Sequence, residues 1–146
     1  MKTAATIIAT SVVLLIIAVV YMHSGLYDFA AITPHSRITL KILGVALSRS
    51  VERHARNIMV PQNLSDPEMV KFGSHHFKAM CVQCHGAPGV GRSEMGQDLY
   101  PRGPDLDKTA RGWTSQQLYW ITRNGIKMTG MPAWGSPLTT MNCGLW

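Results

Sequence analysis

The longest hydrophobic stretch of the chain lies at its beginning. Residues 4–22 contain no charged side chain, and residues 7–20 are nearly all aliphatic. A helix of about 19 residues, rising about 1.5 Å per residue, comes close to spanning the hydrocarbon layer of a membrane. A cleaved signal peptide is the alternative, but it has a shorter apolar region that ends in a small-x-small cleavage site, and residues 21–26 offer no good one. We therefore expect residues 1–24 to form an uncleaved transmembrane anchor.

The next patterned segment repeats large side chains at intervals of three and four, which is the spacing of one helix face. The members of this face are Leu40, Leu43, Leu47, Val51 and His54, and a second face carries Arg49, Arg53 and Arg56. The pattern predicts a basic amphipathic helix of about 20 residues from Arg37 onward, within a connecting region at residues 25–64. Two interpretations stay open. The helix lies along the bilayer surface as a spacer, or it packs on the following domain with a solvated basic side.

Two further helices are predicted in the second half of the chain. Ser65 is placed to cap the first helix, with Pro67 in its first turn and Glu68 completing a capping box, and the helix should run to about Met80. The second helix is capped by Thr114 and ends at residues 124–125, an Asn-Gly pair.

The motif with the most specific chemistry is the run Cys81-Val82-Gln83-Cys84-His85. A C-x-x-C-H run is the attachment signature of a c-type haem, because the two thiols add to the vinyl groups of one porphyrin and the histidine ligates the iron. A zinc site needs four ligands, and Cys143 is the only other cysteine. A thioredoxin-like pair needs a βαβ context that is missing here, and a disulfide between Cys81 and Cys84 leaves His85 unexplained. We therefore predict one covalently bound haem c, with His85 as an iron ligand.

The surroundings of this motif resemble a known family. The pattern Gly73-x-x-x-Phe77-x-x-x-Cys81-x-x-Cys84-His85-Gly86 is similar to the first helix and haem loop of class I, monohaem c-type cytochromes, here of a membrane-anchored bacterial type. The resemblance implies an all-α, cytochrome c-like haem domain at residues 65–138. This domain would follow the transmembrane helix and the amphipathic neck helix.

The resemblance also implies two roles outside the motif. In Gly103-Pro104-Asp105-Leu106, the carbonyl of Pro104 would accept the second ring proton of His85 and so fix its tautomer. In Met131-Pro132-Ala133-Trp134, Met131 would be the sixth iron ligand, and a thioether in that place raises the reduction potential. Met128 is close enough to compete, but it does not match the family pattern.

The end of the sequence departs from that pattern. Class I cytochromes finish with a helix that crosses the first helix, whereas residues 139–146 read Thr-Thr-Met-Asn-Cys-Gly-Leu-Trp and contain few helix formers. We interpret them as an aberrant tail in place of the terminal helix. Reading the codons from Ser136 onward two bases later allows Pro-Thr-His-Asp-Asp-Glu-Leu-Trp-Ala, a capped acidic first turn followed by apolar residues. We therefore expect a frameshift, in the gene or in its reading.

The charge distribution indicates which kinds of surface the protein contacts. The formal net charge is +6, and most of the excess lies before residue 65, which favours contact with acidic lipid headgroups more than a basic docking face. No basic patch interleaved with aromatic residues indicates nucleic-acid binding. Because c-type haem is attached outside the cytoplasmic membrane, the resemblance implies a single-pass protein with its haem domain on the periplasmic side.

The predicted function is one-electron transfer by a membrane-tethered carrier. An iron ligated by both His85 and Met131 has no open position for a substrate, so we do not expect an enzyme. Expected partners are redox proteins, namely respiratory complexes or periplasmic dehydrogenases. Two alternatives remain: a haem subunit permanently docked to a dehydrogenase or oxidase, and a haem enzyme or gas sensor with a labile sixth ligand.

Overall fold

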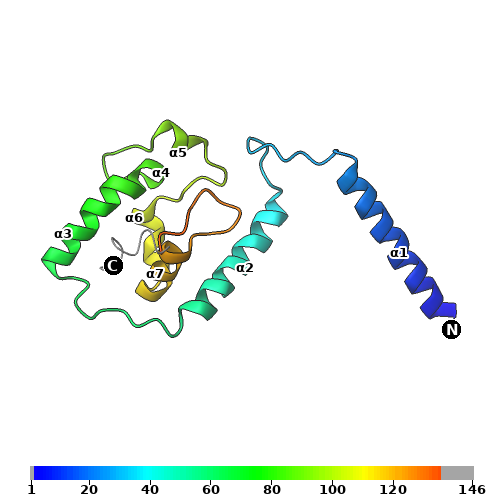
Figure 1. The fold of residues 1–146 in the computed structure, drawn as a ribbon, viewed down its shortest axis with the longest axis horizontal. Coiled ribbons are helices and arrows are strands. Elements are labelled where there is room, and N and C mark those ends of the chain that lie inside the picture. The colour runs from blue at the N-terminus through cyan, green and yellow to red at the C-terminus, as the bar shows by residue number, and fades with distance from the viewer. Residues whose placement is uncertain (1, 136–146) are drawn as a thin grey trace. The chain divides into compact units, whose positions relative to one another are not determined.

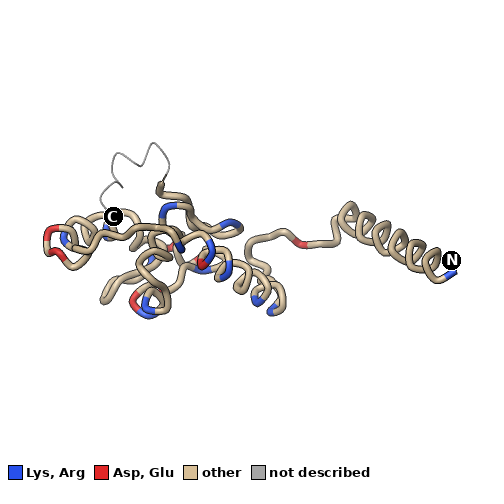
Figure 2. Tube along the Cα trace, turned by 90° about the horizontal axis from the view of Figure 1, so that it is seen from below, with Lys and Arg blue, Asp and Glu red and all other residues tan. Residues whose placement is uncertain are grey.

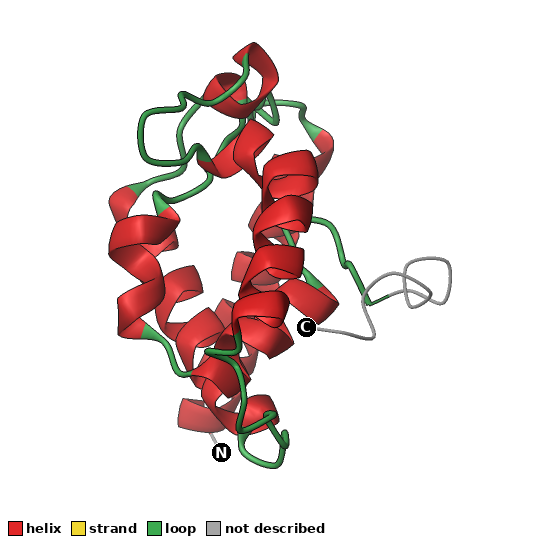
Figure 3. Ribbon diagram, turned by 90° about the vertical axis from the view of Figure 1, so that its left-hand side faces the viewer, coloured by secondary structure: helices red, strands yellow, loops and turns green. Residues whose placement is uncertain are grey.

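The structure, a computed structural model, describes residues 2–135 and is helical throughout its regular elements (Figure 1). In chain order these are α1 (Lys2–His23), α2 (Arg37–Ala55), α3 (Pro67–His76), the π-helical turn η1 (Phe77–Cys81), α4 (Val82–His85), α5 (Glu94–Asp98), α6 (Leu106–Thr109), the 3₁₀ turn η2 (Ala110–Gly112) and α7 (Ser115–Asn124). Loops join them, and the described residues contain no strand (Figure 3). The all-α prediction is confirmed. The tail expected at residues 139–146 lies outside the described residues.

The chain divides into two compact units, the first ending at Thr33 and the second beginning at Pro34. The first unit is built on α1, which is long and apolar enough to cross a membrane. Lys2 is the one Lys, Arg, Asp or Glu residue of α1, and the rest of the helix has no charged colour in Figure 2. Apolar side chains cover α1 on all sides, the pattern of a helix in a protein core or in a membrane, and none of its residues is buried in the structure.

Helix α2 belongs to the second unit and packs against α7. Val51 and Ala55 are the buried hydrophobic residues among those described, and Leu43 and Leu47 on the same side of the helix are half-buried. Burying a valine side chain contributes about 1.5 kcal/mol or more to stability. The face predicted from the leucine spacing is therefore the face that packs on the domain.

Two further contacts join α2 to other segments of the second unit, one near each end of the helix. The ring of His54 stacks on that of Trp120 in α7, with ring centres 5.5 Å apart. Before the helix begins, the backbone N–H of His35 donates to the Tyr100 hydroxyl at 3.1 Å. These contacts agree with the interpretation that α2 packs on the following domain, and they leave its opposite face to be explained.

Helix α3 begins one residue later than the sequence suggested. The cap is Asp66, not Ser65, because the Asp66 carboxylate accepts from the backbone N–H groups of Glu68 at 2.9 Å and Met69 at 3.3 Å. A carboxylate is also favoured over a hydroxyl by the positive end of the helix dipole. The sequence predicts a helix to about Met80; α3 itself ends at His76, and η1 and α4 then continue without a break into the C-x-x-C-H motif.

Helix α7 has the predicted bounds. The Thr114 hydroxyl accepts from the Gln117 backbone N–H, and the Gln117 side chain accepts from the Thr114 N–H, which completes a capping box. Gly125 ends the helix at φ +66°, in the left-handed region that favours glycine. Local capping chemistry therefore fixes both ends of the helix that supports α2.

Candidate haem site

The C-x-x-C-H motif lies at the end of the helical run that starts at α3. Cys81 is the last residue of η1, and α4 contains Cys84 and His85. Residues three apart on a helix lie on one side of it, so the two cysteines share a side. Both are half-buried, and no disulfide joins them to each other. π-helical turns inside helices occur frequently at functional sites.

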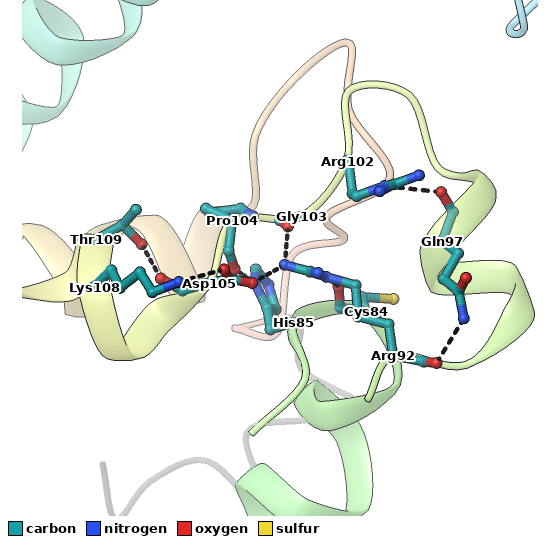
Figure 4. Close-up of polar contacts among 10 residues, drawn as sticks. All are labelled: Cys84, His85, Arg92, Gln97, Arg102, Gly103, Pro104, Asp105, Lys108 and Thr109. Atoms are coloured by element: carbon teal, nitrogen blue, oxygen red, sulfur yellow. Dashed lines mark hydrogen bonds and ion pairs between the residues drawn. The ribbon is translucent and has the colours of Figure 1, made fainter. Parts of the chain in front are cut away.

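The imidazole of His85 is held by one hydrogen bond. Its Nδ1 lies 2.9 Å from the backbone carbonyl oxygen of Pro104 (Figure 4). A carbonyl oxygen can only accept, so Nδ1 carries the proton and donates it. In a neutral ring the other nitrogen, Nε2, then has a lone pair that can bind a metal. The structure thus brings His85 and Pro104 together.

A third residue, Arg92, links the segments that contain His85 and Pro104, and no sequence motif marks it. The guanidinium of Arg92 donates to the carbonyl oxygens of Cys84 and Gly103, at 3.0 Å each, and pairs with the Asp105 carboxylate (Figure 4). Only 20% of the Arg92 side chain is exposed. One side chain thereby joins the motif to both neighbours of Pro104.

Asp105 is also held from its own helix. The Lys108 ammonium lies 3.3 Å from the Asp105 carboxylate. Hydrogen bonding to Lys108, followed by the hydrogen bond and charge of Arg92, lowers the pKa of Asp105 from its usual value. The carboxylate is therefore ionised at neutral pH, which maintains its pairing with Arg92.

Two glycines allow loops to approach the motif closely. A Cβ on Gly96, in α5, would lie 2.1 Å from the carbonyl oxygen of Gln83, and one on Gly103 would lie 2.8 Å from that of Cys84. Ser93 strengthens the first contact, since its backbone N–H and its hydroxyl both donate to the Gln83 carbonyl, at 3.0 and 3.1 Å. The segment that contains α5 therefore packs directly on the motif's backbone.

The predicted sixth ligand lies in a second loop, after α7. The Met131 backbone N–H donates to the Thr129 hydroxyl at 3.1 Å, and its carbonyl accepts from the Ile126 N–H at 3.3 Å. The Met131 side chain is half-buried, whereas Met128 is 70% exposed and has φ +60°. These differences favour Met131 over Met128 as the thioether that faces the interior.

Close contacts connect the loop that contains Met128 and Met131, called here the methionine loop, to the C-x-x-C-H motif. A Cβ on Gly130 would lie 2.6 Å from the Leu99 side chain, and Leu99 directly follows α5. A Cβ on Gly125 would lie 2.8 Å from the Met131 carbonyl, so this loop also presses on the end of α7. The segment at residues 94–99 thus contacts the motif on one side and the methionine loop on another.

These residues fit a covalently bound haem. A cavity of about 230 Å³ beside His85 is lined by Phe77, by residues 86–88 and 90–92 and by residues 105–108. Neither cysteine of the motif nor Met131 lines it, so this cavity by itself does not mark the place of a haem. Among the described residues, no group of three or more His, Cys, Asp or Glu side chains could hold a metal ion by itself. The motif offers two thiols that can bond to the vinyl groups of a porphyrin and one imidazole that can ligate its iron, which is what attachment of a c-type haem requires.

Comparison with known proteins also supports covalent attachment of a haem. The family described as "Cytochrome C oxidase, cbb3-type, subunit III" matches residues 68–142, about half of the chain. No curated protein and no solved structure gave a significant match. The matched region contains the motif, the Arg92 cluster and the methionine loop. The chain belongs to this family of c-type cytochromes, whose domain binds haem c covalently and transfers electrons.

Proposed function

We propose that the protein is a one-electron carrier whose single haem c is bonded to Cys81 and Cys84 and ligated axially by His85 and Met131. When bound, the haem supplies an iron that takes up and releases one electron. The observation that carries the proposal is the hydrogen bond from His85 Nδ1 to the Pro104 carbonyl. It orients the ring and directs the nitrogen that can bind iron away from the backbone.

The methionine loop supports the second axial ligand. The hydrogen bonds of Met131 to Thr129 and Ile126 hold its backbone in a fixed place in this loop. A thioether is soft and neutral and stabilises ferrous iron, which raises the reduction potential. If His85 and Met131 both hold the iron, no ligand position would be left for a substrate, and this favours a carrier over an enzyme.

We further propose that α1 anchors the protein in the cytoplasmic membrane, with the second unit on the periplasmic side. The length and composition of α1 support the anchor. The family description supports a partner of a particular kind, a terminal oxidase or another respiratory complex of the same membrane. A tethered carrier would exchange electrons with such a complex by diffusing in two dimensions.

A matched pair of variants tests the ligand assignment. Met131→Ala should abolish the ferric methionine-to-iron charge-transfer band, lower the reduction potential and allow carbon monoxide to bind the reduced form. Met128→Ala is the control and should leave all three unchanged, because its side chain is exposed. The opposite pattern would move the assignment to Met128. Carbon monoxide binding by the unmodified protein would instead support an enzyme or gas sensor.

A permanently docked subunit is the second candidate, because the matching family is described as a subunit of an oxidase. Purification in mild detergent distinguishes the two. A docked subunit co-elutes with other polypeptides at fixed stoichiometry, whereas a mobile carrier elutes alone with its haem.

A further inference from the structure

The face of α2 that points away from the packed side has an unusual composition. Ile38, Ile42 and Val45 follow one another at spacings of four and three, and their exposed fractions are 72%, 63% and 64%. The same stripe continues through Arg49, Arg53 and Arg56. The outer face is therefore apolar over the first turns of the helix and basic over the last ones.

The segment that precedes α2 in the sequence also exposes large apolar side chains. Residues 24–36 join α1 to α2 and expose Leu26, Phe29 and Ile32 to a similar or greater degree. A contiguous run of exposed large apolar side chains indicates a surface that another phase or molecule covers.

The basic half carries a net positive charge. Glu52 pairs with Arg49 at 3.1 Å and with Arg56 at 3.8 Å, so three arginines stand against one glutamate. Their side chains are well exposed, at 79% for Arg49 and 67% for Arg56. Long basic side chains reach lipid phosphates while their stems cover apolar surface.

The geometry points to a lipid surface as the occupant of this face. We propose that the outer face of α2 lies on the membrane, with Ile38, Ile42 and Val45 in the boundary between headgroups and acyl chains and Arg49, Arg53 and Arg56 on anionic headgroups. The apolar stripe covers about 10 Å along the helix axis, and an interfacial helix lies in the membrane plane with such a stripe facing the acyl chains. This inference rests on the proposed anchor but not on the haem ligands.

The packed side of α2 gives this contact a consequence for electron transfer. Because Val51, Ala55 and His54 hold α2 on α7, a membrane-bound outer face would fix the orientation of the haem domain above the bilayer. The carrier would then present the same side to membrane-embedded partners, rather than rotating freely on its connector.

Spin labelling of the full-length haem protein tests the inference. A nitroxide is attached at Ile42→Cys in a Cys143→Ser background, in vesicles of phosphatidylcholine with or without phosphatidylglycerol. We expect high accessibility to oxygen and low accessibility to a water-soluble nickel complex. The control label at Lys71→Cys, an exposed position on α3, should show the reverse. Replacing Arg49, Arg53 and Arg56 by Gln should weaken the contact in anionic vesicles about fivefold per arginine removed.

Each outcome decides the inference. A haem-containing protein that floats with the vesicles, but whose residue 42 is as accessible to nickel as residue 71, overturns the lipid contact and leaves the anchor and haem proposals standing. Protection of residue 42 only when other membrane proteins are present assigns the face to a protein partner instead. Failure to float overturns the anchor, and the lipid contact with it.

Discussion

Replacing Arg92 should lower the stability of the haem site, although Arg92 is not expected to bond to the haem itself. The variant Arg92→Met keeps a long apolar stem but removes both donors to the carbonyls of Cys84 and Gly103. Hydrogen bonds to a charged group contribute about 1.5–3 kcal/mol each. The ion pair with Asp105 adds less, because its carboxylate is exposed enough for solvent to screen the charges. These contributions are not additive, and water will replace some of them, so we expect a loss of about 2–4 kcal/mol.

Chemical unfolding of the full-length protein in detergent, followed by tryptophan fluorescence, measures this loss. Arg102→Met is a matched control, because Arg102 is exposed and makes a single hydrogen bond to the Gln97 carbonyl at 2.9 Å. We expect the control to change the free energy of unfolding by less than about 1 kcal/mol. If the two variants lower stability equally, Arg92 does not fasten the site and the reasoning is wrong.

Two more predictions follow from the same contacts. Gly96→Ala should destabilise the protein and reduce the yield of haem attachment in cells, because the added Cβ would overlap the Gln83 carbonyl. The control is Gly89→Ala, where φ is positive but no atom lies within 4 Å of an added Cβ, and it should reduce attachment far less. Because the pKa of Asp105 is lowered in the folded state, its carboxylate stabilises the fold above its usual pKa of about 3.9 and stops doing so as the pH falls through the lower folded value. Below about pH 4, the unmodified protein should therefore lose more stability with falling pH than Asp105→Asn does, and parallel pH profiles would refute this.

Local signals in the sequence predicted the helices well. Apolar length indicated α1, capping chemistry indicated α7, and the leucine spacing indicated which side of α2 packs. The cap of α3 was misplaced by one residue, because Ser65 and Asp66 are both good capping residues and only the fold shows which oxygen reaches the N–H groups.

The features that the sequence did not predict depend on contacts between segments that are distant in sequence. Arg92 lies in a glycine-rich loop without periodicity, so nothing local shows that it joins Cys84 to Gly103. In the sequence, the arginines mark the outer face of α2, and the exposure of Ile38, Ile42 and Val45 shows that this face begins with an apolar stripe. The pairing of His85 with Pro104 was expected from family resemblance and not from the spacing of the two residues.

The central claim is that an iron porphyrin is bonded to this polypeptide through Cys81 and Cys84. The most direct test is extraction of the purified protein with acidic acetone, followed by haem staining after denaturing electrophoresis. The account predicts that the colour stays with the polypeptide, and that changing both cysteines to alanine removes it. Pigment that passes into the acetone, or a mature protein that never acquires colour, would contradict the account.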